Sequence, residues 1–247
     1  MEHNIAELRE RFHNLLDALM HDFNLKNYLG EGSPEDIDCA WEEFNDAANH
    51  YGIWTGSGCT KFVIGDDNCD YIIKFQPPYV DEDAGEFDYC AREVEIYQEA
   101  VRAGYADKFA WCAKLFDYEV DDWVLPIYVM EWCQCSYDMI DDEMDDWHYT
   151  KFCSSHGINK GEDDAYEKYC DSRNSHEVEF DERMMEWAYS VWGLDYHNPD
   201  DYDFCRFMKR MSINDIHSGN WGWCNNQLVL VDYSGYGENF GARSINY

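Results

Sequence analysis

Three polar residues late in the chain have the types and spacing to act on a phosphate group. Asp215 is followed five residues later by Asn220, and Asp232 comes twelve residues after that, at the end of an apolar strand. A carboxylate can orient a hydroxyl group and accept its proton, while amide and carboxylate oxygens are ligands that magnesium takes. The pattern predicts magnesium-dependent phosphoryl transfer, with Asp215 as the catalytic residue and Asn220 and Asp232 as metal ligands.

This arrangement resembles the protein-kinase superfamily. Asp215 and Asn220 match the catalytic-loop motif D-x-x-x-x-N, and Asp232 stands at the aspartate of the D-F-G motif. With His217 between them, the loop is more similar to that of aminoglycoside-phosphotransferase-like proteins and other atypical kinases than to that of typical eukaryotic ones. A reduced chain of this kind also resembles bacteriophage and bacterial-effector kinases. The resemblance covers about residues 51–235.

Upstream residues match the same family in order and spacing. Lys74 ends a strand that resembles the V-A-I-K motif, so the resemblance implies that it contacts the α and β phosphates of a nucleotide. Glu93 follows nineteen residues later on a predicted helix, where the ion-pair glutamate of the family falls. Glu95 is the alternative partner for Lys74.

Two further segments fit the same resemblance. Gly56, Ser57 and Gly58 resemble a shortened glycine-rich loop that covers phosphates, although such residues also turn ordinary hairpins. Glu131 and Cys133 lie in a segment that resembles the hinge, where backbone groups hold adenine. The resemblance therefore implies ATP and Mg²⁺ as cofactors.

The elements that must position these residues follow from hydrophobic periodicity. Strands are expected at 53–55, 61–64, 71–75, 114–120 and 124–130, with a helix at 86–103 between the third and the fourth. Ahead of them, apolar residues at helical spacing predict a first helix over 5–23, and Ser33 followed by Pro34 predicts the start of a second. Tight turns are expected at 56–58 and 66–68.

The second half of the chain is predicted to be mainly helical. Helices are expected at 137–147, 178–192 and 199–211, the last capped by Asn198, while 150–175 has the least regular pattern. A β-hairpin follows, with strands at 221–224 and 228–231 and a turn at Asn225 and Asn226.

These elements, with the resemblance, predict an α+β, two-lobed protein-kinase-like fold. We expect an N-terminal helical extension at 1–50, an N-lobe at 51–131 and a reduced, mainly helical C-lobe at 132–247. The N-lobe should hold a five-stranded antiparallel sheet and one helix.

The net charge of −34 limits the classes of partner. It opposes binding to nucleic acid and to anionic lipid, because both carry negative charge. No apolar run long enough for a membrane span occurs, and the first residues lack a secretory pattern, so a cytoplasmic protein is expected, including one delivered to or expressed in a host cell.

Two functions remain open at this point. The first is an ATP- and magnesium-dependent phosphotransferase whose acceptor is a protein or a small molecule. The alternative is an acidic pseudokinase or DNA mimic, which would act by binding a basic protein partner through its negative surface.

Overall fold

The computed structural model describes residues 4–22, 53–57, 61–66, 70–76, 88–120, 123–175 and 180–234. The chain divides into two compact units, which are treated separately below. The first consists of Met1–Ala106 and Ala110–Trp132, and the second of Asp107–Phe109 and Cys133–Tyr247. Both combine helices with antiparallel strands, so the predicted α+β class is confirmed at that level. Among the described helices, none has the length and apolar character needed to cross a membrane.

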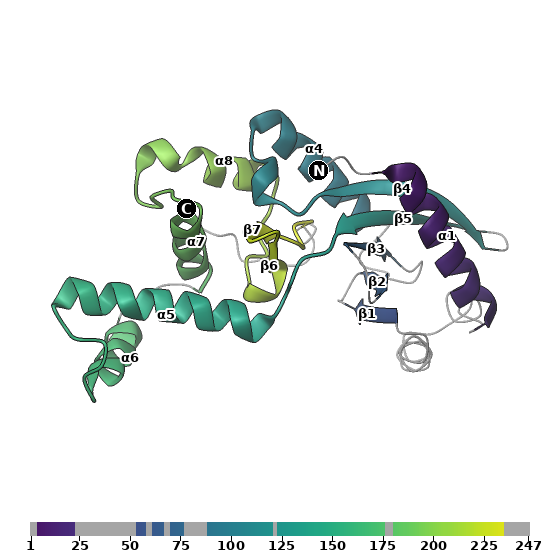
Figure 1. The fold of residues 1–247 in the computed structure, drawn as a ribbon. Helices are drawn as coiled ribbons and strands as arrows, with labels where there is room; N and C mark the ends of the chain where they lie inside the picture. The colour runs from purple at the N-terminus through teal and green to yellow at the C-terminus, as the bar shows by residue number, and fades with distance from the viewer. Residues whose placement is uncertain are drawn as a thin grey trace. The chain divides into compact units, whose positions relative to one another are not determined.

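The first unit is built on a five-stranded antiparallel sheet with the strand order β1-β2-β3-β5-β4 (Figure 1). Each neighbouring pair of strands is antiparallel, and β4 and β5 form a long hairpin. The strands are β1 Ile53–Ser57, β2 Phe62–Asp66, β3 Tyr71–Phe75, β4 Cys112–Val120 and β5 Trp123–Glu131.

One face of this sheet forms the apolar core of the first unit. Ile64, Ile73 and Val129 lie opposite one another on β2, β3 and β5, and all three are fully buried. Helix α1 (Ile5–Asp22) contributes Phe12 and Leu16 to the same cluster and contacts β4. The predicted N-terminal helix is confirmed, and it packs as an integral part of this core.

The opposite face of the sheet carries different side chains, because successive residues of a strand point to opposite sides. Lys74 lies across from Val63 on β2 and from Tyr128 on β5. Helix α4 (Tyr89–Ala103) supplies a buried glutamate, Glu93, that meets Lys74. Asp88 caps α4 by accepting a hydrogen bond from the Ala91 backbone N–H.

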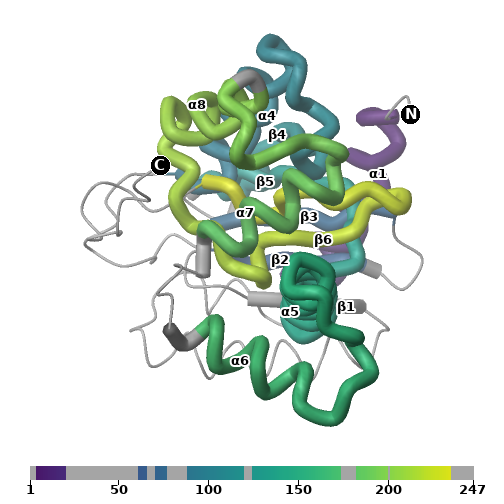
Figure 2. The backbone as a smooth tube through the Cα atoms, turned by 90° about the vertical axis from the view of Figure 1, so that its left-hand side faces the viewer, coloured from purple at the N-terminus to yellow at the C-terminus, as the bar shows by residue number. Residues whose placement is uncertain are grey.

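The second unit consists of helices and one β-hairpin. Helix α5 contacts α6 and α7, and Figure 2 shows α5 nearly end-on with α6 running across the view beneath it. The elements are α5 Tyr137–His156, α6 Ala165–Ser175, α7 Phe180–Val191, α8 Asp203–Arg210, β6 Trp221–Cys224 and β7 Gln227–Leu230.

Two helices differ from the predictions in this unit. Helix α5 runs to His156, where Gly157 ends it in a left-handed conformation, and α6 occupies the segment predicted to be the least regular. The weak apolar pattern of α6 is explained by its anchoring, because Tyr169 and Arg173 both donate hydrogen bonds to Asp145 on α5.

The start of α8 was also predicted wrongly. Pro199–Asp201 forms a separate 3₁₀ turn, and Tyr202, not Asn198, occupies the N-cap of α8 without a side-chain cap.

The β6–β7 hairpin matches its prediction closely. Asn225 and Asn226 both have positive φ, 50° and 64°, as a type I′ turn requires.

A short segment from the first half of the chain belongs to the second unit. Phe109 forms a parallel bridge with Leu230 of β7. Its ring packs edge-on against Tyr233 at a centroid distance of 5.0 Å and contacts Phe204 and Phe207 of α8. This aromatic cluster holds together α8, which precedes the hairpin, and Tyr233, which follows it.

Candidate functional site

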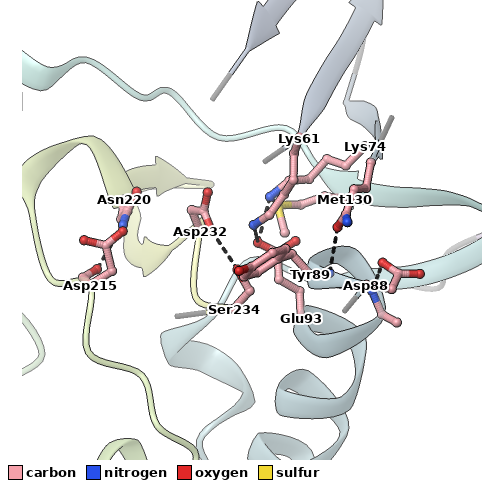
Figure 3. A network of polar contacts seen from close by, with 12 residues as sticks. Lys61, Lys74, Asp88, Tyr89, Glu93, Met130, Asp215, Asn220, Asp232 and Ser234 are labelled. Carbon is pink, nitrogen blue, oxygen red and sulfur yellow. Dashed lines mark hydrogen bonds and ion pairs between the residues drawn. The ribbon is translucent and has the colours of Figure 1, made fainter. Parts of the chain in front are cut away.

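The predicted lysine and glutamate form a buried ion pair in the first unit. Lys74 Nζ donates a hydrogen bond to Glu93 Oε1 at 2.9 Å, and Lys74 also lies 3.9 Å from Met130 Sδ (Figure 3). Strand β3 fixes the lysine between two paired strands, and α4 fixes the glutamate. A buried charge pair held by rigid elements keeps the ammonium group in one place.

Glu95, the alternative partner, does not meet Lys74. It is exposed on α4 and pairs with Arg92, three residues earlier on the same helix. The two glutamates are two residues apart, so they point to different sides of the helix and only Glu93 faces the sheet.

A second lysine joins the pair, and sequence reasoning missed it. Lys61 Nζ donates to the same atom, Glu93 Oε1, at 2.8 Å. We call Lys61, Lys74 and Glu93 the charged triad. Its side chains are almost completely buried, with exposed fractions of 4%, 4% and 2%. Lys61 is two residues before Val63, and Val63 pairs with Lys74 on the neighbouring strand. Because side chains two residues apart in a strand point to the same side, Lys61 lies on the face of the sheet that carries Lys74.

The surroundings of the charged triad are closely packed and hydrogen-bonded. Burial raises the pKa of the Cys90 thiol, and the nearby Glu93 carboxylate adds to the rise, so this thiol stays protonated. Burial also raises the pKa of Tyr128, whose hydroxyl donates to Asp88. Gln76 accepts a hydrogen bond from the Tyr89 backbone N–H and thereby ties the end of β3 to the start of α4.

The prediction that Gly56 and Ser57 form a turn is wrong. Gly56 and Ser57 continue strand β1 and pair with Val63 and Phe62 of β2. Backbone pairing with β2 stabilises the strand conformation of these two residues, although their types alone favour a turn. Gly58 lies outside the described residues.

The two predicted hinge residues belong to different units. Glu131 ends β5, and its backbone N–H donates to the Trp111 carbonyl at 2.9 Å. Cys133 is the first residue of the second unit's main segment, and its carbonyl accepts a hydrogen bond from the Cys135 thiol. Their predicted role toward adenine stays a prediction.

In the second unit, a short loop holds Asp215 and Asn220 together. The Asn220 side-chain amide donates to the Asp215 carbonyl at 2.9 Å (Figure 3). Ile213 and Ile216 are buried on either side of Asp215 and anchor the loop, while Asp215 itself is partly exposed. Because the amide nitrogen is used in this way, the Asn220 oxygen is the atom suited to a metal ion.

The pairing of β6 with β7 brings Asp232 close to Asn220. Trp221 pairs with Leu230, and the next residue outward, Val231, donates its N–H to the Asn220 carbonyl at 2.9 Å. Asp232 follows immediately, so two residues twelve positions apart lie at the same open end of one hairpin. The Ser234 hydroxyl lies 3.4 Å from Asp232 Oδ1.

His217 lies beside the predicted catalytic aspartate. The Gly219 backbone N–H donates to His217 Nδ1 at 3.1 Å, which places the proton of a neutral imidazole on Nε2. That nitrogen is 3.6 Å from Asp215 Oδ2. This contact favours a role in which His217 orients the Asp215 carboxylate.

The oxygen donors of Asn220 and Asp232 suit magnesium, which usually takes one or two protein ligands and completes its shell with water and phosphate oxygens. Throughout the described ranges, no cluster of three or more His, Cys, Asp or Glu side chains suits a metal ion. A two-residue site of this kind depends on phosphate to complete it, whereas a zinc site would need a larger protein-derived set.

Comparison with known proteins adds little to this geometry. No protein-family model and no curated protein matches the chain. Among solved structures, an aminoglycoside phosphotransferase from Alicyclobacillus acidocaldarius subsp. acidocaldarius is similar at 15% sequence identity and a TM-score of 0.29. The match covers 74% of this chain and 62% of that one, so this chain spans less than two thirds of the protein it matches. A likeness this weak supports neither a fold nor an activity by itself.

Proposed function

We propose that this protein is an ATP- and magnesium-dependent phosphotransferase of the protein-kinase-like superfamily, whose acceptor is a protein or a small molecule. The observation that carries the proposal is the presence of two groups of residues, one in each unit. One is the buried Lys74–Glu93 pair, and the other is the loop and hairpin that hold Asp215, Asn220 and Asp232. Each group has the donor types that phosphoryl transfer requires.

In this proposal each residue has a defined task. Lys74 binds the α and β phosphates, and Glu93 keeps its ammonium group in position. Asn220 and Asp232 hold the magnesium ion, which when bound neutralises charge on the phosphates. Asp215 orients the acceptor hydroxyl and accepts its proton as the hydroxyl oxygen bonds to the γ phosphorus and ADP departs. Positioning and charge neutralisation would supply most of the lowering of the barrier.

The test separates binding from chemistry. Asp215→Asn keeps the side-chain shape but removes the charge that accepts the proton. We expect ATP affinity within a few-fold of wild type and a loss of phosphoryl transfer of about two to four orders of magnitude, the usual scale for general acid–base catalysis. Calorimetry measures the affinity, and labelled ATP measures the transfer, beginning with autophosphorylation. Wild-type turnover in Asp215→Asn would overturn the catalytic assignment.

The net charge of −34 favours one other function, that of an acidic binding protein. Such a protein has no physical need of a buried Lys74–Glu93 pair together with metal-type ligands on a separate hairpin. The two functions are distinguished by the wild type alone. ATP binding without transfer to any acceptor would indicate a pseudokinase, and absence of ATP binding would indicate a binder of basic proteins.

A further inference from the structure

Two cysteines at the start of the second unit lie on the same side of a short β-bridge. Gln134, the residue between them, pairs with Trp223 of β6 through two backbone hydrogen bonds of 2.9 and 3.0 Å. The chain is therefore extended at this point, and side chains two residues apart in an extended chain point to the same side. Cys133 and Cys135 are both thiols in this structure, and we call them the thiol pair.

A glycine on the facing strand lets the thiol pair approach. A Cβ atom placed on Gly222 would lie 2.7 Å from Cys135 Sγ and 3.0 Å from Cys133 Cβ. These two cysteine atoms are therefore no farther apart than the sum of those distances. The Cys135 thiol also donates a hydrogen bond to the Cys133 carbonyl at 3.3 Å, so its sulfur points back along the chain toward Cys133. Because glycine has no side chain, nothing at position 222 separates the pair.

The spacing of the pair permits a disulfide, but at a cost to the bridge. Residues two apart in a strand have Cα atoms about 6.6 Å from each other, near the upper end of the range of roughly 4.4–6.8 Å for disulfides. A disulfide also needs Cβ atoms about 3.5–4.5 Å apart, so the segment must bend inward as the bond forms. Because Gln134 lies at the centre of this segment, its N–H and C=O groups then turn away from Trp223. The disulfide and the bridge therefore oppose each other.

The two cysteines differ in exposure, which gives each a different part in oxidation. Cys135 is exposed, whereas Cys133 has an exposed fraction of 6%. Exchange with a disulfide begins when a thiolate attacks a sulfur atom, so the accessible cysteine reacts first. A second thiol within reach then resolves the product, which is the usual arrangement of redox-reactive cysteines.

We propose that Cys133 and Cys135 are a redox-reactive pair, which a small disulfide such as glutathione disulfide converts to an intrachain disulfide that weakens the Gln134–Trp223 bridge. The Cys135 thiolate attacks one sulfur of glutathione disulfide, forms a mixed disulfide and releases one glutathione thiolate. The Cys133 thiolate then attacks the Cys135 sulfur and releases the second. The two cysteine sulfurs lose two electrons, which glutathione disulfide gains, and the two cysteine protons pass to the two glutathione thiolates.

The bridge connects the thiol pair to the proposed catalytic loop. Trp223 lies on β6, which begins directly after Asn220. An effect of oxidation on phosphoryl transfer would rest on the proposed function. The reaction of the thiol pair does not, and none of the measurements below needs ATP, so the two can fail separately.

Mass spectrometry after treatment with glutathione disulfide tests the reaction. The proteins are wild type, Cys135→Ser, Cys133→Ser and, as a control for the loss of another partly exposed thiol, Cys170→Ser. In wild type and Cys170→Ser we expect a peptide in which Cys133 and Cys135 are joined, and dithiothreitol should restore both thiols. Cys133→Ser should stop at the mixed disulfide on Cys135. A wild-type protein in which both remain thiols, or in which either is joined to Cys224, would overturn the proposal.

Amide hydrogen exchange tests the effect on the bridge. The Gln134 and Trp223 N–H groups should exchange about tenfold faster in the oxidised wild type than in the reduced one, the scale of losing one or two hydrogen bonds. The Ile158 N–H, which donates to the Cys153 carbonyl at the other end of α5, should not change. Cys135→Ser treated in the same way controls for effects of the oxidant elsewhere. Equal exchange of the bridge amides in oxidised and reduced wild type would overturn the proposed weakening of the bridge.

Discussion

Replacing Glu93 with glutamine removes the carboxylate that two buried lysines share. The substitution keeps the size and shape of the side chain, so the change is almost purely electrostatic. Lys61 and Lys74 both lose the acceptor that lies 2.8 and 2.9 Å from their ammonium nitrogens.

Two estimates of the loss in the free energy of unfolding agree in size. Removing one partner of a buried ion pair costs about 3–5 kcal/mol. Two unit charges about 5–6 Å apart repel by roughly 3 kcal/mol at an effective dielectric constant of about 20, which is of similar size. We expect a loss of about 4 kcal/mol in the free energy of unfolding.

Urea denaturation measures this loss. Glu95→Gln is the matched control, since the Glu95 side chain is 67% exposed and makes an ion pair within its own helix, worth about 0.5 kcal/mol. A Glu93→Gln protein within about 1 kcal/mol of wild type would refute the electrostatic account of the charged triad.

Two further predictions concern the second unit. Gly222→Ala would place a Cβ atom 2.7 Å from Cys135 Sγ and should cost about 1–3 kcal/mol in the free energy of unfolding, whereas Gly161→Ala, whose Cβ meets nothing closer than 3.6 Å, should be nearly neutral. Partial burial raises the pKa of Asp145, but hydrogen bonds, of which that from Arg183 is the strongest, outweigh burial and hold this pKa below its usual value. The stability that Asp145 contributes is therefore present above the unfolded pKa of about 3.9 and is lost as the pH falls through the folded pKa. Acid unfolding monitored by circular dichroism should therefore be less steep in Asp145→Asn, and an unchanged acid profile would contradict the assignment.

The parts predicted well from the sequence are those with strong local patterns. The run of aromatic and β-branched residues in β3, the helical stripe of α1 and the two asparagines of the β6–β7 turn each specify their own structure. The loop that holds Asp215 and Asn220 is local in the same sense, because the amide of one bonds to the carbonyl of the other five residues earlier.

The parts missed depend on contacts between distant segments. A lysine at the start of a hairpin strand is usually solvated. The pairing of Val63 with Lys74 shows that Lys61 lies on the same face of the sheet as Lys74. Gly56 is part of a strand because β2 pairs with it, although glycine alone predicts a turn. Helix α6 has a weak apolar pattern in the sequence, and its contacts are with α5: Ala165 and Tyr169 pack against Tyr149 and Cys153, and Tyr169 and Arg173 donate hydrogen bonds to Asp145.

The placement of Phe109 means that the second unit is not one continuous stretch of chain. A gene fragment that starts at Cys133 would encode the helices and the hairpin but omit this aromatic ring. Tyr233, Phe204 and Phe207 would then line a gap, and losing a buried phenylalanine typically costs about 3–5 kcal/mol. The β6–β7 hairpin therefore cannot be excised as a self-sufficient module, and its integrity depends on residues translated well before it.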